Sequence, residues 1–153
     1  MFDGQTWAML LRGAYLPLHR AAGALFAKRR MTADQFVLLS LLAERDDVMQ
    51  QDLVRRSGSD PNTIRAMLVL LERAGFVKRR RHPEDRRARS VVLTAQGRAM
   101  QRHLRRDAEN FHARIAEAIP AADARQVATV LRSLGQLFDD RSPRDLPIPA
   151  SSK

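Results

Sequence analysis

Apolar residues recur at helical spacing near the start of the chain. Between residues 6 and 28 they lie three or four positions apart, which predicts an amphipathic helix. The stripe consists of Leu10, Leu11, Ala14, Leu18, Ala21, Ala22 and Leu25. Pro17 lies inside this pattern, and a proline in a helix interior removes a hydrogen bond and clashes with the preceding turn. We therefore expect the helix to be kinked or split at this residue.

A second helix is predicted to begin after Thr32. Thr32 and Gln35 have the spacing of a capping box, in which each side chain satisfies a free amide at the helix start. The expected buried stripe consists of Phe36, Leu39 and Leu42. A short helix should follow at about 50–57, and Gly58 is placed to end it.

Another helix is predicted directly after this turn. Asp60 offers a capping oxygen, and Pro61 suits the first helical position. Apolar residues then follow at i, i+3, i+4 and i+7. They are Ile64, Met67, Leu68 and Leu71. Two helices joined by a turn of a few residues form a candidate helix-turn-helix.

The pattern then changes to that of a β-hairpin. Residues 76–81 and 89–93 are predicted to be strands, joined by a polar tip that contains a proline. A long helix, capped by Thr94, should end where Pro120 breaks it. A last helix is expected at about 121–138. Its apolar positions are Val127, Leu131, Leu134 and Phe138. Residues after it, 139–153, are predicted to be a disordered tail.

The charge of the chain is basic and unevenly placed. There are 27 Lys and Arg against 17 Asp and Glu, a formal net charge of +10. The twelve residues from Lys78 to Arg89 hold seven basic and two acidic side chains, so half of the net charge lies in the predicted hairpin. A helix fits the major groove of DNA, and hairpin arginines can reach phosphates and the minor groove. The alternative is a solvated charged hairpin on a protein that ignores DNA.

Other residue patterns exclude several classes of protein. The chain has no cysteine, which excludes disulfides, zinc–thiolate sites and thiol-based redox sensing. No apolar run reaches the length of a membrane span, and the first residues lack a signal-peptide pattern, so we expect a cytoplasmic protein. Common nucleophile, P-loop, zinc-protease and dinucleotide motifs are missing, so we expect no enzyme, cofactor or metal site. Aromatic residues, at 5%, offer little for stacking on RNA bases.

Three segments carry a family resemblance. Residues 71–77 are LERAGFV, residues 85–88 are DRRA and residues 91–97 are VVLTAQG. The first resembles the end of the recognition helix and the entry into the wing in the MarR family of bacterial regulators. The other two resemble the family's wing-and-exit signature. In this signature an aspartate, any residue and an arginine are followed further along by leucine, threonine, two other residues and glycine. The likeness covers about residues 6–138, and the order of predicted elements also matches.

This resemblance implies a mainly helical fold with a small β-hairpin wing. A winged helix-turn-helix lobe at 32–93 would be flanked by dimerisation helices at 6–28 and 95–138, all within one domain of residues 1–138. The implied function is that of a transcription regulator that binds a palindromic DNA operator as a homodimer. Members of the family usually repress, and many leave DNA when they bind a small, often phenolic, anion.

Four wing residues are candidate DNA contacts. By the resemblance, Arg87 matches the wing arginine that enters the minor groove, and Asp85 matches the acid that positions it. Arg86 is a second candidate at the tip, and Arg89 is a further basic candidate in the same hairpin.

The helical candidates each have a simpler alternative. Arg65 could read a guanine edge or touch only phosphate. Asn62 and Thr63 could contact DNA or only satisfy free amides at the helix end. Gln50 and Gln51 begin the preceding helix and could touch phosphate.

Effector binding rests on one pair of residues. Tyr15 and His19 lie four residues apart on the first predicted helix and could line a pocket for a small molecule. The alternative for both is packing in the core or in a dimer interface. A ligand-independent winged-helix protein, regulatory or architectural, is therefore the second functional hypothesis.

Overall fold

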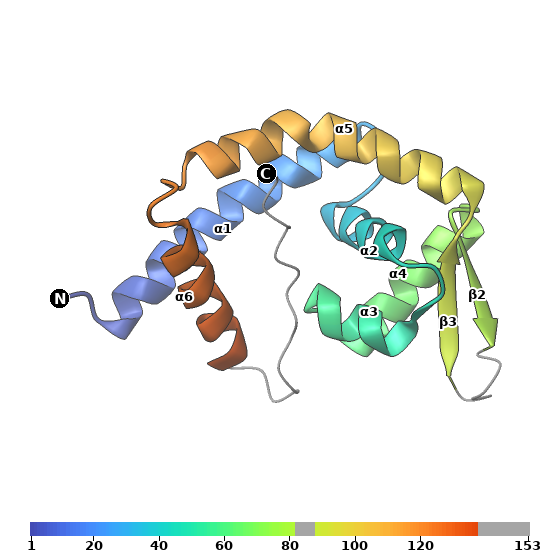
Figure 1. The fold of residues 1–153 in the computed structure, drawn as a ribbon, viewed down its shortest axis with the longest axis horizontal. Coiled ribbons are helices and arrows are strands. Elements are labelled where there is room, and N and C mark those ends of the chain that lie inside the picture. The colour runs from blue at the N-terminus through green and yellow to red at the C-terminus, as the bar shows by residue number, and fades with distance from the viewer. Residues whose placement is uncertain (82–87, 138–153) are drawn as a thin grey trace.

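The computed structural model describes residues 1–81 and 88–137, which form six helices and a small antiparallel sheet (Figure 1). The helices are α1 (Gly4–Ala27), α2 (Ala33–Glu44), α3 (Gln50–Ser57), α4 (Pro61–Arg73), α5 (Ala95–Glu117) and α6 (Ala124–Leu137). The strands are β1 (Val48–Met49), β2 (Val77–Arg81) and β3 (Arg89–Leu93). The predicted class, mainly helical with a small hairpin, is confirmed. Within these ranges no helix combines the length and the apolar character that spanning a bilayer would need.

The helix starts follow the predicted caps. The Thr32 hydroxyl accepts a hydrogen bond from the backbone N–H of Gln35 at 3.1 Å, and the Gln35 side chain accepts one from the backbone N–H of Thr32 at 3.0 Å. The capping box is therefore confirmed. Gly58 ends α3 with a φ of 77°, a left-handed conformation that glycine adopts at little cost. Asp60 is the N-cap of α4, and Pro61 is its first residue.

The two terminal helices differ from their predicted limits. Helix α1 runs without interruption through Pro17, so the predicted split is wrong, and the alternative, a kink, stays a prediction. A proline removes one backbone donor, and an exposed proline leaves the turns on either side able to keep their own hydrogen bonds. Helix α6 begins at Ala124, later than predicted, because residues 121–123 form a turn. Phe138 and the predicted tail lie outside the described residues.

The sheet has the strand order β1-β3-β2, and both pairings are antiparallel. Strands β2 and β3 form the predicted hairpin, in which Val77 lies opposite Leu93 and Arg81 lies opposite Arg89. Strand β1 adds a short edge, with Val48 opposite Val91. A two-residue strand is too short to show an alternating pattern, and the sequence therefore gave no sign of it.

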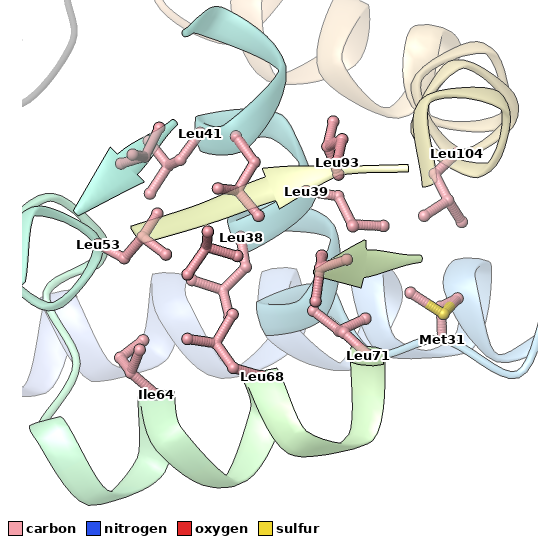
Figure 2. Packing of buried hydrophobic residues seen from close by; sticks show 14 of the residues in the cluster. Met31, Leu38, Leu39, Leu41, Leu53, Ile64, Leu68, Leu71, Leu93 and Leu104 are labelled. Carbon is pink, nitrogen blue, oxygen red and sulfur yellow. The ribbon is translucent and has the colours of Figure 1, made fainter. Parts of the chain in front are cut away.

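A single apolar cluster joins the helix-turn-helix to the sheet and to both long helices (Figure 2). Its fully buried members include Leu38, Leu39, Leu53, Ile64, Leu68, Leu71 and Val91. Phe26 of α1 and Leu104 of α5 belong to the same cluster, so the lobe is fastened to the long helices by packed side chains. The stripe predicted for α2 is present: Leu39 and Leu42 are buried in the cluster, and Phe36 packs against the same cluster.

The long helices leave apolar side chains exposed at their far end. Figure 1 shows α5 running from the sheet beside α1, with α6 at the end away from the sheet. No residue of α6, as described, is buried. The exposed large apolar residues include Trp7, Met9, Leu10 and Leu11 of α1 and Val130, Leu131 and Leu137 of α6. Exposed apolar surface of this extent usually marks an interaction site.

Candidate nucleic-acid interface

The first turn of α4 is fixed by its cap and points exposed polar side chains outward. The backbone N–H groups of Asn62 and Thr63 donate to Oδ1 of Asp60 at 3.0 and 2.9 Å. The Thr63 hydroxyl donates to Oδ2 of the same carboxylate. These hydrogen bonds, the one from the Thr63 side chain first, lower the pKa of Asp60 below its usual value. Asp60 therefore satisfies the helix-end amides, and the side chain of Asn62 is not needed for that role.

An open groove with a volume of about 720 Å³ lies between the helix-turn-helix and the hairpin. It is lined by Met49, Gln50, Gln51, Val54, Pro61, Arg65, Arg79, Ala88 and Arg89. We call it the wing groove. It brings together four of the residues predicted to contact DNA: Gln50, Gln51, Arg65 and Arg89. Asn62 and Thr63 are exposed on the neighbouring first turn of α4 and do not line the groove.

The wing groove is basic, and part of its charge is not compensated. Arg65, Arg79 and Arg89 all line it. Among residues 1–81 and 88–137, no ion pair involves Arg65, Arg81 or Arg89. Arg81 and Arg89 also lie directly opposite each other on the hairpin, a placement that is unfavourable for like charges. An anion bound beside them would relieve this repulsion.

Arg79 contributes to the hairpin charge in the sequence, but its place in the wing groove is not among the predicted contacts. Its backbone N–H donates to Oε1 of Glu72 at 3.0 Å, and its Nε and Nη2 donate to Oε2 at 2.8 and 2.5 Å. The side-chain hydrogen bonds from Arg79, followed by the backbone one, lower the pKa of Glu72. The alternation of the strand offers a signal, because Arg79 lies two residues after buried Val77 and so shares its face.

The hairpin is joined to α5 by a tight contact. The backbone N–H of Thr94 donates to the carbonyl of Phe76 at 3.0 Å, and its hydroxyl donates to the carbonyl of Gly75 at 2.6 Å. The same hydroxyl accepts the backbone N–H of Gly97 at 3.0 Å, which caps α5. A Cβ at Gly97 would lie 1.9 Å from the carbonyl oxygen of Phe76. The glycine of the sequence signature is therefore required for this close approach.

The candidates at the hairpin tip, Asp85, Arg86 and Arg87, lie outside the described residues. The two effector candidates are on α1. The Tyr15 hydroxyl lies 3.4 Å from Nδ1 of His19, and both side chains are exposed. Tyr15 also lines a cavity of about 220 Å³ together with residues of α2, α4 and the α3–α4 turn, whereas His19 does not line it.

A second groove, missed by the sequence reasoning, lies between α2 and α5. It has a volume of about 610 Å³ and contains three arginines of one helix face: Arg98, Arg102 and Arg105. Phe36 and His112 lie at the same groove with ring centroids 6.1 Å apart. The hydroxyl of Ser40, which also lines it, is buried and has no hydrogen-bond partner within the described chain. We call this the α5 groove.

The described fold, a helix-turn-helix packed on an arginine-rich hairpin and held by two long helices, is that of a winged helix-turn-helix protein. The model of the MarR family matches residues 31–88. YdgJ of Bacillus subtilis (strain 168), named an uncharacterized HTH-type transcriptional regulator, is 35% identical over 94 residues, 61% of this chain and 57% of its own. YetL of the same organism, named an HTH-type transcriptional repressor, is 40% identical over 76 residues, 48% of this chain and 46% of its own.

The match thus spans about half the length of these relatives. The structure of Bordetella bronchiseptica BpsR, described as regulated in its DNA binding by 6-hydroxynicotinic acid, is similar with a TM-score of 0.77. It is 25% identical and covers 88% of this chain and 96% of that chain. The chain is therefore similar to MarR-family proteins, in sequence over residues 31–88 and in fold over most of its length.

Proposed function

We propose that this protein is a sequence-specific transcription regulator that binds double-stranded DNA as a homodimer and represses from a palindromic operator. One observation carries the proposal: the wing groove gathers Arg65 and Arg89, which have no ion-pair partner in the described part of the chain, beside the exposed first turn of α4. In this arrangement α4 enters the major groove, and the hairpin arginines reach the flanking backbone and minor groove. A cytoplasmic location and the absence of enzymatic activity follow from this proposal.

Helix α4 supplies the base contacts in this proposal. Arg65 is exposed on its second turn, and a guanidinium can donate two hydrogen bonds to O6 and N7 of guanine. Asn62 and Thr63 lie one turn earlier, and Gln50 and Gln51 begin α3 across the groove. By the family resemblance, Asp85, Arg86 and Arg87 act at the hairpin tip. Repression is supported by the naming of YetL as a repressor.

Release by a small acidic effector is the second part of the proposal. The description of BpsR supports it. The α5 groove suits an anion with an aromatic part, because Arg102 and Arg105, which have no ion-pair partner among the described residues, lie with the rings of Phe36 and His112. Tyr15 and His19 stay candidates on α1. A ligand-independent regulator is the alternative, and a thermal-shift screen of aromatic acids, with Arg102→Ala as the comparison variant, separates the two.

The experiment that tests DNA binding is selection of bound duplexes from a random pool, followed by measurements on single-base variants of the selected site. Arg65→Ala should weaken binding to the selected site by about 1–3 kcal/mol and relax the preference at one position in each half-site. Arg114→Ala, an exposed arginine of α5 outside the wing groove, is the control and should bind normally. Equal weakening on every sequence would make Arg65 a phosphate contact. Failure of the wild type to select any sequence would contradict the proposed function.

A further inference from the structure

Glu72 places a carboxylate beside the wing groove. It lies in the last turn of α4, and its side chain and that of Arg79 are about one-third and one-quarter exposed. Three hydrogen bonds join the two residues, two from the guanidinium and one from the backbone of β2. The pair therefore fixes both the direction of the Arg79 side chain and the distance between α4 and β2.

Helix stability does not account for this acid. A negative charge near the C-terminus of a helix is unfavourable, because the free carbonyl groups there carry partial negative charge. Arg73, the next residue, is the type of side chain that suits this position. The favourable interactions of Glu72 come mainly from Arg79, with a smaller electrostatic one from Arg89, so its effect is to be sought first in what it does to Arg79.

The three arginines of the wing groove are consequently not equivalent. Arg65 and Arg89 have no ion-pair partner in the part of the chain that the structure describes. Arg79 is held by Glu72, so its charge is largely compensated. Free arginines bind phosphate on any sequence, and each phosphate that is neutralised adds to affinity without adding discrimination.

We propose that Glu72 is a specificity-determining residue, which limits sequence-independent DNA binding by holding Arg79 away from free contact with phosphates. This inference rests on the proposed DNA-binding function. It extends that function by assigning a role in discrimination to an acid that itself need not touch DNA. A residue that weakens binding to wrong sequences raises specificity even when it adds nothing to binding of the right one.

The alternative is that the pair only staples β2 to α4. Such a staple would affect unfolding, and its loss would weaken all DNA binding together. The two roles predict opposite changes in affinity for DNA of unrelated sequence. They also differ for a double variant that replaces both Glu72 and Arg79, because Arg79 is then no longer present to be freed.

The test compares Glu72→Gln with wild type on two duplexes of equal length: the site that the wild type selects from a random pool, and a scrambled version of it. Glutamine keeps the shape of the side chain and removes its charge. We expect affinity for the scrambled duplex to rise about threefold to tenfold, and the ratio of selected to scrambled affinity to fall by a similar factor. The slope of log affinity against log salt should steepen by about 0.9 if one more phosphate is neutralised.

Two further variants keep the test decisive. Glu44→Gln removes the acid of another ion pair of the same lobe, with Arg56, away from the wing groove, and should leave the ratio unchanged. Glu72→Gln combined with Arg79→Gln should return the affinity for scrambled DNA to about the wild-type level. Circular dichroism confirms that each variant is folded.

An unchanged ratio and salt slope for folded Glu72→Gln, with a wild type that still selects a site, would overturn the inference alone. Parallel loss of affinity on both duplexes, not reversed in the double variant, would identify a staple and also overturn it. A wild type that selects no site would remove the proposed function and this inference with it.

Discussion

Gly97 shows how much the joint between the hairpin and α5 depends on one residue. A methyl group at this position would lie 1.9 Å from the carbonyl oxygen of Phe76 and 3.1 Å from Cδ2 of Leu93. The first contact is with backbone that also accepts the N–H of Thr94, so it cannot move without loss of a hydrogen bond. Gly97→Ala should therefore destabilise the fold by about 1–3 kcal/mol or more.

Chemical denaturation measures this difference, and Gly23→Ala provides the matched control. Gly23 lies inside α1, and a Cβ there would meet no atom within 4 Å. Alanine is the better helix former by about 1 kcal/mol, so Gly23→Ala should be neutral or stabilising. Equal stability of the two variants would mean that α5 can shift away from Phe76 without cost.

Asp60 gives the start of α4 a dependence on pH. Hydrogen bonds from Thr63 and Asn62 lower the pKa of this carboxyl in the folded protein. A lowered folded pKa means that the stabilisation is fully present above the unfolded pKa and is lost as the pH falls through the folded one. Asp60→Asn keeps a capping oxygen without the charge. Its thermal midpoint should therefore lie below that of the wild type at pH 7, and the gap should begin to narrow as the pH falls below about 4.

Thermal unfolding of both proteins between pH 7 and pH 3 tests this expectation. Glu72 and Asp107 also have lowered pKa values, Glu72 because of Arg79 and Asp107 because of Arg29, and both are present in the two proteins. Their effect therefore cancels in the difference. A gap that stays constant over the whole range would show that the charge of Asp60 does not stabilise the cap.

At the scale of helices and strands, local chemistry predicted most of the fold. The capping box at Thr32, the left-handed glycine at Gly58 and the cap at Asp60 are short-range features, and each lies where the sequence placed it. Strand β1 was not predicted, because its pairing with β3 is a long-range contact between two residues on each side. The split at Pro17 was wrong, because a local rule about proline does not include the helical turns on both sides.

For the candidate site, the sequence likewise predicted individual residues but not the contacts that depend on how the elements pack. Charge and helix position singled out Arg65 and Arg89, and the fold brings them to one groove with Gln50 and Gln51. The pairing of Glu72 with Arg79 was not predicted, because it depends on how α4 packs against β2. The α5 groove was missed for the same reason, since its arginines and Phe36 come from helices far apart in the sequence.

At the scale of the whole molecule, the winged-helix lobe is well packed, whereas the opposite end of the molecule leaves apolar side chains uncovered. The lobe has a continuous core, whereas the far ends of α1 and α6 present exposed apolar residues to solvent. Leu10 and Leu131 are each about half exposed, at 52% and 50%. A second copy of the chain would bury these residues around a two-fold axis and would place two wing grooves on one side of a palindromic site.

Removal of α6 should therefore separate the two copies and leave each lobe folded. Since no residue of α6 as described is buried, a chain that ends at residue 120 keeps the whole described core. It should be monomeric by light scattering and should bind the selected site about a hundredfold more weakly, because two half-sites are then no longer bound by one molecule. A chain that ends at residue 140 keeps α6 and should match the full-length protein in both measurements. Circular dichroism of the shorter chain distinguishes loss of the dimer from loss of the fold. If a folded chain ending at residue 120 remains dimeric, the interface does not need α6, and α1 and α5 must supply it.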